Sequence, residues 1–362
     1  MLSKPILIMA GGTGGHIYPA LAVADHLREK GFSLFWLGTN SGLEARVVPE
    51  KGYQLLTINI SGLRGKGLMK WIQAPVVICR GLFQSLLILM HLKPAVVLGM
   101  GGFVSGPGGL ATWIMRIPLC IHEQNAIAGL TNRLLAPLAN LVMEAFPNTF
   151  ACRFNAKLTG NPVRTEIRNF VITHKHCKSG VKNPLQLLVL GGSQGARKLN
   201  QIVPETLAII PDNIHIEVRH QTGDKLYEET KAIYRNLNRV VKLEPYIENM
   251  AEAYAWADIV ICRSGAITIA ELSAAGVPSI LVPYPFAVDD HQTANARFLS
   301  EAGAAILIKE KDLTKEYLCQ LLCNFFESNQ NLEIMAKCAH KVDKPDATKI
   351  IAALCLEVAH AG

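Results

Sequence analysis

Short apolar runs that end at glycines alternate along the chain with segments whose apolar residues recur every three or four positions. The first run is Ile6–Met9, and a glycine-rich turn at residues 11–15 follows it directly. The next segment carries apolar residues on one face of a helix: Ile17, Leu21, Ala24 and Leu27. The run has the length of a buried strand, and the segment after it has the period of a helix. The alternation of the two predicts parallel α/β structure.

The same beginning recurs in the second half of the chain. Leu187–Leu190 is an apolar run, and Gly191–Gly195 is a second glycine-rich turn before another helical period. These two starts predict an α/β protein with two facing Rossmann-like domains and a cleft between them. The length of 362 residues agrees, because single cores stop growing at roughly 250–300 residues. Proline and glycine at residues 160–162 break regular structure. We therefore expect domains at residues 1–162 and 163–362, with a last helix that can return to the first domain.

Cysteine use and the remaining apolar stretches indicate the compartment. The nine cysteines are an odd number without a CxxC pair, which favours a reducing compartment and packing roles. The first apolar run lacks the pattern of a signal peptide, so we expect a cytoplasmic protein. The stretch Pro75–Leu92 includes Arg80 and Gln84, and a membrane span there would place a charge in hydrocarbon. We expect a helix that is partly core and partly interfacial.

The net charge of +7 is concentrated in the first half of the chain. Residues up to Thr165 include 15 Lys and Arg against 6 Asp and Glu, and no acidic residue lies between Glu50 and Glu123. A stretch of one sign favours an anionic partner, which is a phosphate, a lipid headgroup or nucleic acid. A solvated face without a partner is the alternative. Aromatic residues are sparse in this stretch and no nucleic-acid-binding module is recognisable, so we expect no nucleic-acid partner.

The glycine-rich turns do not have the sequences of two common nucleotide sites. Gly12-Thr13-Gly14 lacks the third glycine of the dinucleotide fingerprint, and the next predicted strand ends without a carboxylate for a ribose. The chain contains no GxxxxGK[ST] sequence either. What remains is a set of helix starts whose backbone N–H groups can approach a phosphate. A third turn, at residues 99–109, contains six glycines and follows a predicted strand end, where open α/β sheets bind ligands.

A further anion site is predicted near residue 265. Residues 256–265 predict a strand that ends in a tight turn, and Ala266–Ala275 predicts a helix that Gly276 closes. Backbone N–H groups at the start of this helix suit a diphosphate. Glu271 lies within the first two turns, where its carboxylate can accept hydrogen bonds from ribose hydroxyls. A surface glutamate favoured by the helix dipole is the alternative.

Six motifs occur in one order over nearly the whole chain, and together they resemble a known family. They are Gly11–His16, Gly99–Gly109, His122–Asn125, Gly160–Arg164, Gly191–Ala196 and Cys262–Glu271. The last of them, with Asp289-Asp290-His291-Gln292 downstream, resembles the donor site of GT-B glycosyltransferases. More narrowly, the chain is similar to the bacterial UDP-N-acetylglucosamine:lipid I N-acetylglucosaminyltransferases, the MurG family. Phe103 stands where some members carry tyrosine, and His291-Gln292 keeps only the second of two glutamines.

The resemblance implies inverting transfer of N-acetylglucosamine (GlcNAc) from UDP-GlcNAc to the 4-OH of undecaprenyl-diphospho-N-acetylmuramoyl-pentapeptide (lipid I). The product is lipid II for peptidoglycan synthesis. The implied substrate-binding residues are Thr13, Gly14, Gly15, Asn125, Arg164, Ser193, Ile247, Ala266, Ile267, Thr268, Ile269, Ala270, Glu271 and Gln292. In this interpretation the backbone of Ile247 pairs with uracil, Glu271 holds the ribose and Gln292 contacts the sugar hydroxyls. The chain has no DxD motif, so we expect neither a metal ion nor a cofactor.

Transfer of this kind needs a base that takes the proton of the acceptor hydroxyl. His16, at the first glycine turn, is the first candidate, because histidine side chains titrate near ~6.5, close to working pH. Binding of the acceptor diphosphate, or capping of a helix, is an equal alternative for His16. Glu123, at another predicted strand end, is the second candidate base.

A lipid acceptor implies an anionic membrane surface as partner. We expect a peripheral protein on the cytoplasmic face of the bacterial plasma (inner) membrane. Several apolar residues lie among the basic residues of the first half of the chain: Leu63, Leu68, Trp71, Ile72, Leu82, Phe83 and Trp113. We expect some of them to form an apolar surface patch that enters the headgroup region, and the others to belong to the core. A UDP-GlcNAc 2-epimerase, another GT-B glycosyltransferase and a non-enzymatic nucleotide-sugar-binding module are the alternatives.

Overall fold

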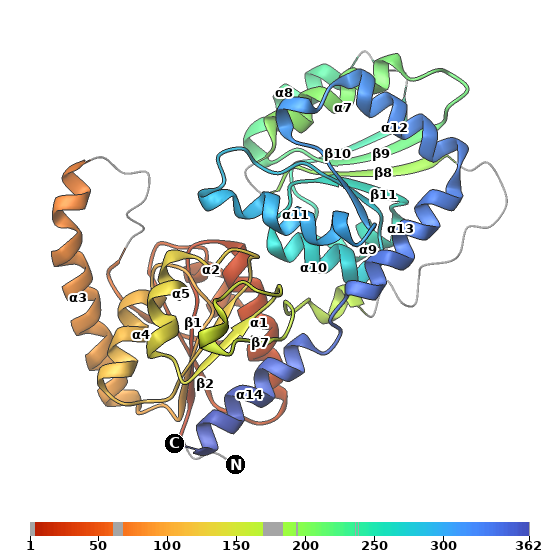
Figure 1. Ribbon diagram of the computed structural model, residues 1–362. Coiled ribbons are helices and arrows are strands. Elements are labelled where there is room, and N and C mark those ends of the chain that lie inside the picture. The colour runs from red at the N-terminus through yellow and green to blue at the C-terminus, as the bar shows by residue number, and fades with distance from the viewer. Residues whose placement is uncertain are drawn as a thin grey trace. The chain divides into compact units, whose positions relative to one another are not determined.

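The chain forms two compact units in the computed structural model (Figure 1). The structure describes residues 4–60, 68–168, 184–192, 195–235, 237 and 239–361, and only the backbone within residues 68–73. The first unit consists of residues 1–164 and 344–362, and the second of residues 165–343. The chain therefore passes from one unit to the other twice.

The first unit is built on a seven-stranded parallel sheet in the order β3-β2-β1-β4-β5-β6-β7. The strands are β1 (Ile6–Met9), β2 (Leu34–Gly38), β3 (Gln54–Thr57), β4 (Val96–Gly99), β5 (Leu119–Glu123), β6 (Leu141–Glu144) and β7 (Lys157–Leu158). β1 pairs with β2 on one side and with β4 on the other. The strand order thus reverses between β1 and β4, and doubly wound sheets bind ligands at the carboxyl ends of strands at such a point.

Helices cover both faces of this sheet. They are α1 (Gly14–Glu29), α2 (Glu44–Glu50), α3 (Leu68–Leu92), α4 (Ser105–Ile114), α5 (Leu130–Leu135) and α14 (Ala347–Ala361), with 3₁₀ turns η1 (Ala136–Leu138) and η2 (Cys152–Phe154). Ile6 and Ile8 of β1 belong to the core that α1 and α14 close, whereas Leu7 and Met9 belong to the core on the opposite face. The division follows from the strand itself, because successive side chains point to opposite faces of a sheet.

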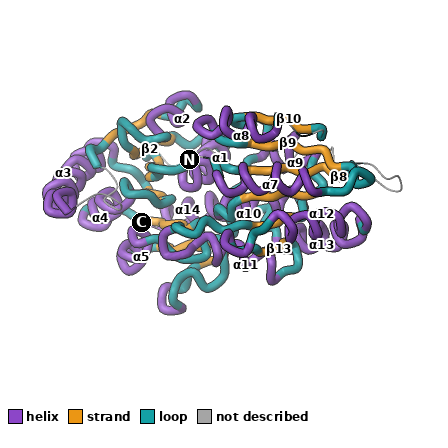
Figure 2. Tube along the Cα trace, turned by 90° about the horizontal axis from the view of Figure 1, so that it is seen from above, coloured by secondary structure: helices purple, strands orange, loops and turns teal. Residues whose placement is uncertain are grey.

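The second unit repeats this design with a six-stranded parallel sheet in the order β10-β9-β8-β11-β12-β13. The strands are β8 (Leu185–Leu190), β9 (Ile216–Gln221), β10 (Val241–Glu244), β11 (Ile259–Cys262), β12 (Ser279–Leu281) and β13 (Ala305–Leu307). The helices are α7 (Arg197–Ile209), α8 (Tyr227–Tyr234), α9 (Met250–Trp256), α10 (Ala266–Ala275), α11 (His291–Glu301), α12 (Lys315–Glu327) and α13 (Asn329–Val342). The short turns are η3 (Asp224–Leu226), η4 (Val288–Asp290) and η5 (Glu310–Asp312). Figure 2 shows the orange strands of this unit among its purple helices.

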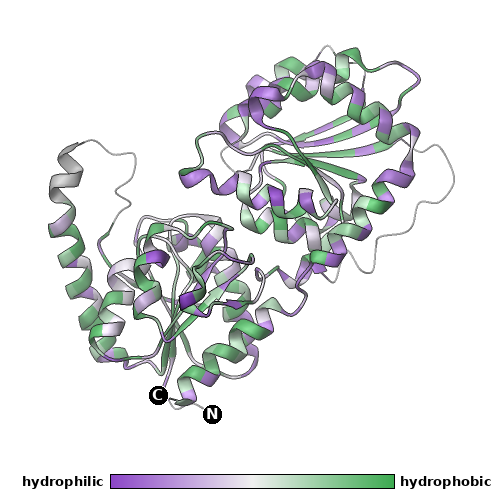
Figure 3. Ribbon diagram, viewed as in Figure 1, coloured by the Kyte–Doolittle hydropathy of each residue, from purple (hydrophilic) through white to green (hydrophobic). Residues whose placement is uncertain are grey.

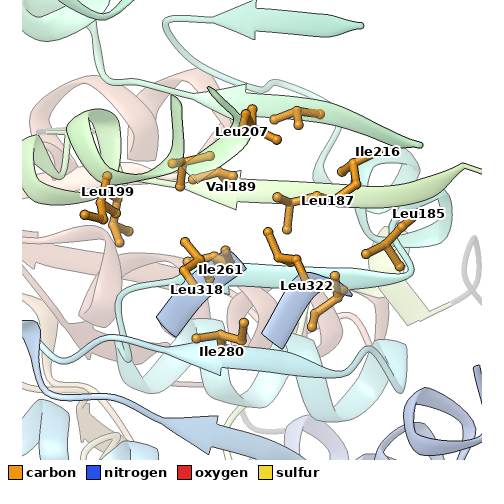
Figure 4. Close-up of a cluster of buried hydrophobic side chains, with 14 of the residues drawn as sticks. Leu185, Leu187, Val189, Leu199, Leu207, Ile216, Ile261, Ile280, Leu318 and Leu322 are labelled. Atoms are coloured by element: carbon orange, nitrogen blue, oxygen red, sulfur yellow. The ribbon is translucent and has the colours of Figure 1, made fainter. Parts of the chain in front are cut away.

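The core of the second unit lies between its sheet and the helices α7 and α12 (Figure 4). Leu187 and Val189 of β8 and Ile261 of β11 meet Leu318 and Leu322 of α12, and all five side chains are fully buried. Burial of each such side chain contributes about 1.5–3 kcal/mol. The rigid sheet that results positions the turns at its carboxyl edge.

Helix α3 has one packed face and one exposed apolar face. It packs against α4, and Ser85 and Leu89 are buried. The opposite face leaves apolar side chains exposed: Val76, Phe83, Leu87 and Met90. The described part of α3 is largely green, or hydrophobic, in Figure 3. Residues Ala74–Leu92 are long and apolar enough to cross a membrane by length and composition alone, and 17% of that apolar window is buried.

Candidate active site

The first glycine turn lies at the carboxyl end of β1, beside the end of β4. The two strand ends are joined because Met100 N donates a hydrogen bond to Met9 O at 2.8 Å. Thr13 is the N-cap of α1 and has an extended backbone. Gly14 and Gly15 are the first helical residues, and the N–H groups of a first helical turn have no carbonyl partner within the helix. The turn therefore presents donors that suit a phosphate group.

Glycine is required where the turn at residues 99–104 meets this first turn. Gly102 has a φ of +84°, and a Cβ atom there would collide with the carbonyl oxygen of Gly11. Gly101 has a φ of +94°, and a Cβ atom there would lie 2.9 Å from His16 Nδ1. Both positions favour glycine by conformation and by space. The third glycine-rich turn thus packs directly behind the imidazole of His16.

Glu44 of α2 holds the first glycine turn, and no feature of the sequence predicts this role. Its side chain is fully buried. Oε2 accepts a hydrogen bond from Gly12 N at 3.0 Å, and Oε1 accepts from Thr39 N at 3.1 Å and from Thr39 Oγ1 at 2.7 Å. Hydrogen bonds to a charged group are stronger than neutral ones. Glu44 therefore fixes the shape of the turn that opens α1.

The Glu44→Gln variant is expected to have a free energy of unfolding about 1.5–3 kcal/mol lower than that of the native chain. The amide NH₂ group of glutamine would face at least one of the three donors that Glu44 now accepts from, and that donor would lose its acceptor. Chemical denaturation measures the difference. Glu50→Gln is the matched control, because Glu50 is exposed at the other end of α2. Equal stability of the two variants would contradict a holding role for Glu44.

His16 is connected by hydrogen bonds to the end of β5. Its Nδ1 lies 2.8 Å from Gln124 Oε1, and Gln124 Nε2 lies 3.0 Å from His122 Nδ1. His122 Nε2 lies 3.1 Å from both Thr159 Oγ1 and Gly160 O. Burial lowers the pKa of His122 to about 4, although its hydrogen bond to Gly160 acts in the opposite direction. His122 is therefore neutral at physiological pH.

Glu123, the second candidate base, is held by four N–H donors. Oε1 accepts from the backbone N of Asn125 at 3.0 Å and from its Nδ2 at 3.2 Å. Oε2 accepts from Gly129 N at 3.0 Å and from Asn132 Nδ2 at 2.9 Å. The Glu123 side chain is 2% exposed, and its bonds shape the loop that positions Asn125. This geometry is that of a structural carboxylate, so it favours His16 as the base.

Arg164 lies beside the first glycine turn, in the first unit. Its guanidinium carbon is 5.6 Å from the centroid of the Tyr18 ring, within the range of a cation–π contact. The Tyr18 ring in turn covers Gly14, where a Cβ atom would lie 2.9 Å from Tyr18 Cε2. A cation near the start of α1 adds to the attraction of the helix N-terminus for an anion.

The second glycine turn follows β8 in the second unit. Gly191 N donates to Gln221 O at 3.0 Å, which joins the turn to the end of β9. Gly195 has a φ of +76°, and a Cβ atom there would lie 2.5 Å from Thr222 O. Only glycine allows this close approach of two backbones. Ser193, predicted to contact the diphosphate, lies outside the described residues.

Helix α10 begins immediately after β11, with Gly265 as its N-cap. Ile269 N donates to Gly265 O at 3.0 Å and closes the first turn. The backbone N–H groups of Ala266–Thr268 therefore lie at the carboxyl end of β11, in the first turn of a helix, and Ala270 follows them. This arrangement suits a diphosphate, as predicted from the sequence.

Gln292 of α11 is joined to the turn before α10. Ser264 Oγ donates to Gln292 O at 2.8 Å, and Asn295 Nδ2 donates to Ser264 O at 3.1 Å. Tyr284 N donates to Gln292 Oε1 at 2.9 Å. The Gln292 amide oxygen thus accepts from the backbone, and Nε2 is the amide atom suited to the predicted contact with a sugar hydroxyl.

Glu271 is a buried residue of α10, not a surface glutamate. It is 6% exposed, and Tyr254 OH donates to its Oε2 at 3.0 Å. Tyr254 of α9 is itself buried, and no sequence feature predicts this contact. Ile247 is fully buried in the connection between β10 and α9, so its side chain fixes the backbone that is predicted to meet uracil.

The two doubly wound units define a glycosyltransferase of the GT-B class. Residues 6–144 match the N-terminal domain of glycosyltransferase family 28, and residues 186–351 match the C-terminal domain of that family. The chain belongs to glycosyltransferase family 28. The predicted fold class and family are therefore confirmed. Within the described residues, no group of three or more His, Cys, Asp or Glu side chains is arranged to hold a metal ion.

Relatives match over almost their whole length. A protein of Nitrosococcus oceani, named UDP-N-acetylglucosamine--N-acetylmuramyl-(pentapeptide) pyrophosphoryl-undecaprenol N-acetylglucosamine transferase, is 51% identical over 354 residues, 98% of each chain. A protein of the same name from Methylococcus capsulatus is 48% identical and covers 99% of this chain and 100% of its own. The crystal structure of Acinetobacter baumannii MurG superposes with a TM-score of 0.84 at 39% identity, covering 98% of this chain and 99% of that one. A putative UDP-N-acetylglucosamine 2-epimerase from Listeria monocytogenes shares the fold at 16% identity and a TM-score of 0.67.

Proposed function

We propose that this chain transfers GlcNAc from UDP-GlcNAc to the 4-OH of the N-acetylmuramoyl residue of lipid I, with inversion, to give lipid II. The observation that carries this proposal is the identity of 51% over 98% of both lengths to a relative whose name states the donor, the lipid-linked acceptor and the sugar transferred. The glycine turns, the start of α10, the hydrogen-bonded His16 of the first unit and the buried Glu271 of the second unit support it. Each is a feature that binding of a sugar diphosphate or deprotonation of a hydroxyl requires.

The chemistry is a direct displacement. The acceptor 4-oxygen attacks the anomeric carbon, the bond from that carbon to the diphosphate oxygen breaks, and UDP leaves with the electron pair. His16 takes the proton of the acceptor hydroxyl through its Nε2. The backbone N–H groups at the start of α10 and the guanidinium of Arg164 stabilise the charge that develops on the diphosphate.

The test is transfer of radiolabelled GlcNAc from UDP-GlcNAc to lipid I, compared with the same reaction without lipid I. The proposal requires labelled lipid II in the first reaction and unchanged UDP-GlcNAc in the second. Formation of a 2-epimer without acceptor would replace this proposal by an epimerase. Binding of UDP-GlcNAc without turnover on lipid I would replace it by a binding module.

An anionic membrane surface is the second partner in this proposal, at the cytoplasmic face of the bacterial inner membrane. The exposed apolar face of α3 supports it. Helix α4 packs against α3, and α5 packs against α4. These two helices carry further exposed apolar side chains: Trp113, Leu130 and Leu134. Leu82, by contrast, is half-buried and packs against the core, and Leu63, Leu68, Trp71 and Ile72 lie outside the described side chains. Exposed Arg80 and Arg133 accompany the apolar face, and each cation near an anionic leaflet contributes about 1 kcal/mol.

The Phe83→Ser variant is expected to co-sediment about tenfold less with vesicles that contain anionic lipid, because insertion of a Phe side chain contributes about 1.5–3 kcal/mol. Phe83 is 62% exposed. Ile334→Ser is the matched control, since Ile334 is 51% exposed on α13 of the second unit. Equal losses in both variants, or none in either, would contradict this membrane face.

A further inference from the structure

The hydrogen bonds that run from His16 into the first unit end on backbone carbonyls. His16 Nδ1 meets Gln124 Oε1 at 2.8 Å, and Gln124 Nε2 lies 3.0 Å from His122 Nδ1 and 3.2 Å from His122 O. His122 Nε2 lies 3.1 Å from Gly160 O. A carbonyl oxygen accepts hydrogen bonds and never donates them. The two carbonyls therefore determine the direction of every bond in the series.

The orientation of the Gln124 amide follows from the first carbonyl. The atom that faces His122 O must be a donor, so it is the amide nitrogen, and the atom that faces His16 is the amide oxygen. An amide oxygen only accepts. Nδ1 of His16 must therefore carry the hydrogen of this bond.

The second carbonyl determines the protonation of His122. Its Nε2 lies 3.1 Å from both Gly160 O and Thr159 Oγ1, and the Thr159 hydroxyl itself donates to Gly160 O at 3.0 Å. Both oxygens therefore face Nε2 as acceptors, so His122 Nε2 carries a hydrogen. Its Nδ1 is then the acceptor for Gln124 Nε2, as a neutral imidazole requires. Burial, which lowers the pKa of His122 to about 4, agrees with this neutral form. A protonated His122 would point a donor at the Gln124 NH₂ group and break the series.

We infer that Gln124 is a positioning residue that holds His16 as its Nδ1–H tautomer, so that the lone pair of Nε2 is the one available to a substrate. Its catalytic meaning rests on the proposed function, in which His16 Nε2 takes the acceptor proton. The Gln124 oxygen also faces the ring that becomes positively charged in that step, and its dipole stabilises the imidazolium. His122 acts one step further away, by fixing the orientation of Gln124.

The surroundings enclose the Gln124 side chain and hold its backbone. Its side chain is 1% exposed, and Asn161 Nδ2 donates to its backbone O at 2.9 Å. Gly101 packs behind His16 without a side chain, which leaves room for the ring at this angle. Residues that orient a metal-bound histidine through its second nitrogen typically change activity by about 10–100-fold when they are replaced, and we expect an effect of the same order for Gln124.

The direct test is NMR spectroscopy of the full chain with ¹⁵N-labelled histidine, in which long-range ¹⁵N–¹H correlations identify the protonated nitrogen of each neutral ring. The His16 signals are those that disappear in His16→Ala. The inference requires protonated Nδ1 and unprotonated Nε2 in the native chain, and a mixture of tautomers in Gln124→Leu. A native His16 with its hydrogen on Nε2 would overturn it. This readout does not depend on activity, so it separates the tautomer from the question of whether His16 is the base.

Kinetics of two substitutions give the second test. Gln124→Leu removes the acceptor of the Nδ1–H group, and kcat is expected to fall about 10–100-fold with little change in the KM for UDP-GlcNAc. Gln124→Glu retains an acceptor and is expected to keep more turnover than Gln124→Leu, although a buried carboxylate that loses the bond to His122 O makes the protein less stable to heat. Gln84→Leu is the control, because it removes a glutamine that accepts from Asn59 N away from His16. If Gln124 only fills space, the leucine variant is the more active of the two, and the inference fails.

Discussion

The His16→Ala variant is expected to lose about 10²–10⁴-fold in kcat, the usual contribution of a general base. The KM for UDP-GlcNAc is expected to stay within about twofold, because the proposed role of His16 concerns the acceptor hydroxyl and the transition state. The imidazole meets Gln124 on one side and has Gly101 behind it, so alanine leaves no buried charge and no strained backbone. Initial rates of labelled GlcNAc transfer at saturating lipid I measure the effect.

Glu123→Ala provides the contrast. It removes the acceptor of four hydrogen bonds, and each buried donor left unpaired costs about 1–3 kcal/mol. Its loss of activity is therefore expected together with a lower melting temperature, whereas His16→Ala removes one hydrogen bond and is expected to melt closer to the native chain. Native turnover of His16→Ala would exclude His16 as the base. Loss of turnover in Glu123→Ala without loss of stability would instead support Glu123 as the general base.

The Glu271→Ala variant is expected to bind UDP-GlcNAc about 10–100-fold more weakly. Hydrogen bonds to a charged group contribute about 1.5–3 kcal/mol, and each 1.4 kcal/mol is a factor of ten in affinity. Tyr254 OH donates to the Glu271 carboxylate at 3.0 Å. Tyr254→Phe is therefore expected to give a smaller loss of affinity for UDP-GlcNAc. Isothermal titration with UDP-GlcNAc in the absence of acceptor measures both losses of affinity.

A ligand without ribose hydroxyls tests the assignment of Glu271 more sharply. The native chain is expected to bind UDP more tightly than its 2′-deoxy and 3′-deoxy analogues, and Glu271→Ala is expected to bind the three alike. Equal discrimination by native chain and variant would show that the Glu271 carboxylate serves the fold, through Tyr254, and not the ribose.

Local patterns in the sequence predict much of this fold. The apolar run Ile6–Met9 coincides with β1, and the predicted helix Ala266–Ala275 coincides with α10. Both predictions are correct because the spacing of apolar residues, the length of the segment and the glycine that ends it can all be read within one segment. The glycine-rich turns can be predicted in the same way, because each directly follows an apolar run that is recognisable as a strand.

The contacts that complete the candidate site could not be predicted in this way. Gln124 meets His16 across 108 positions of the chain, and Glu44 meets Gly12 across 32. No spacing rule links such residues, because their distance depends on how the turns of neighbouring strands stack. Gln124 lies within a motif that the sequence does reveal, but its role depends on which amide atom faces the histidine, and that follows only from the carbonyls around it.

The path of the chain has a consequence for synthesis. The core around α1 includes Ile351, Ala352 and Cys355 of α14, which follow the whole second unit in the chain. On the ribosome, the second unit can therefore finish folding while the first still exposes an apolar surface to the cytosol. The domain that is translated first is the last to be complete, so chaperones have a longer opportunity to bind it than its position in the chain would suggest.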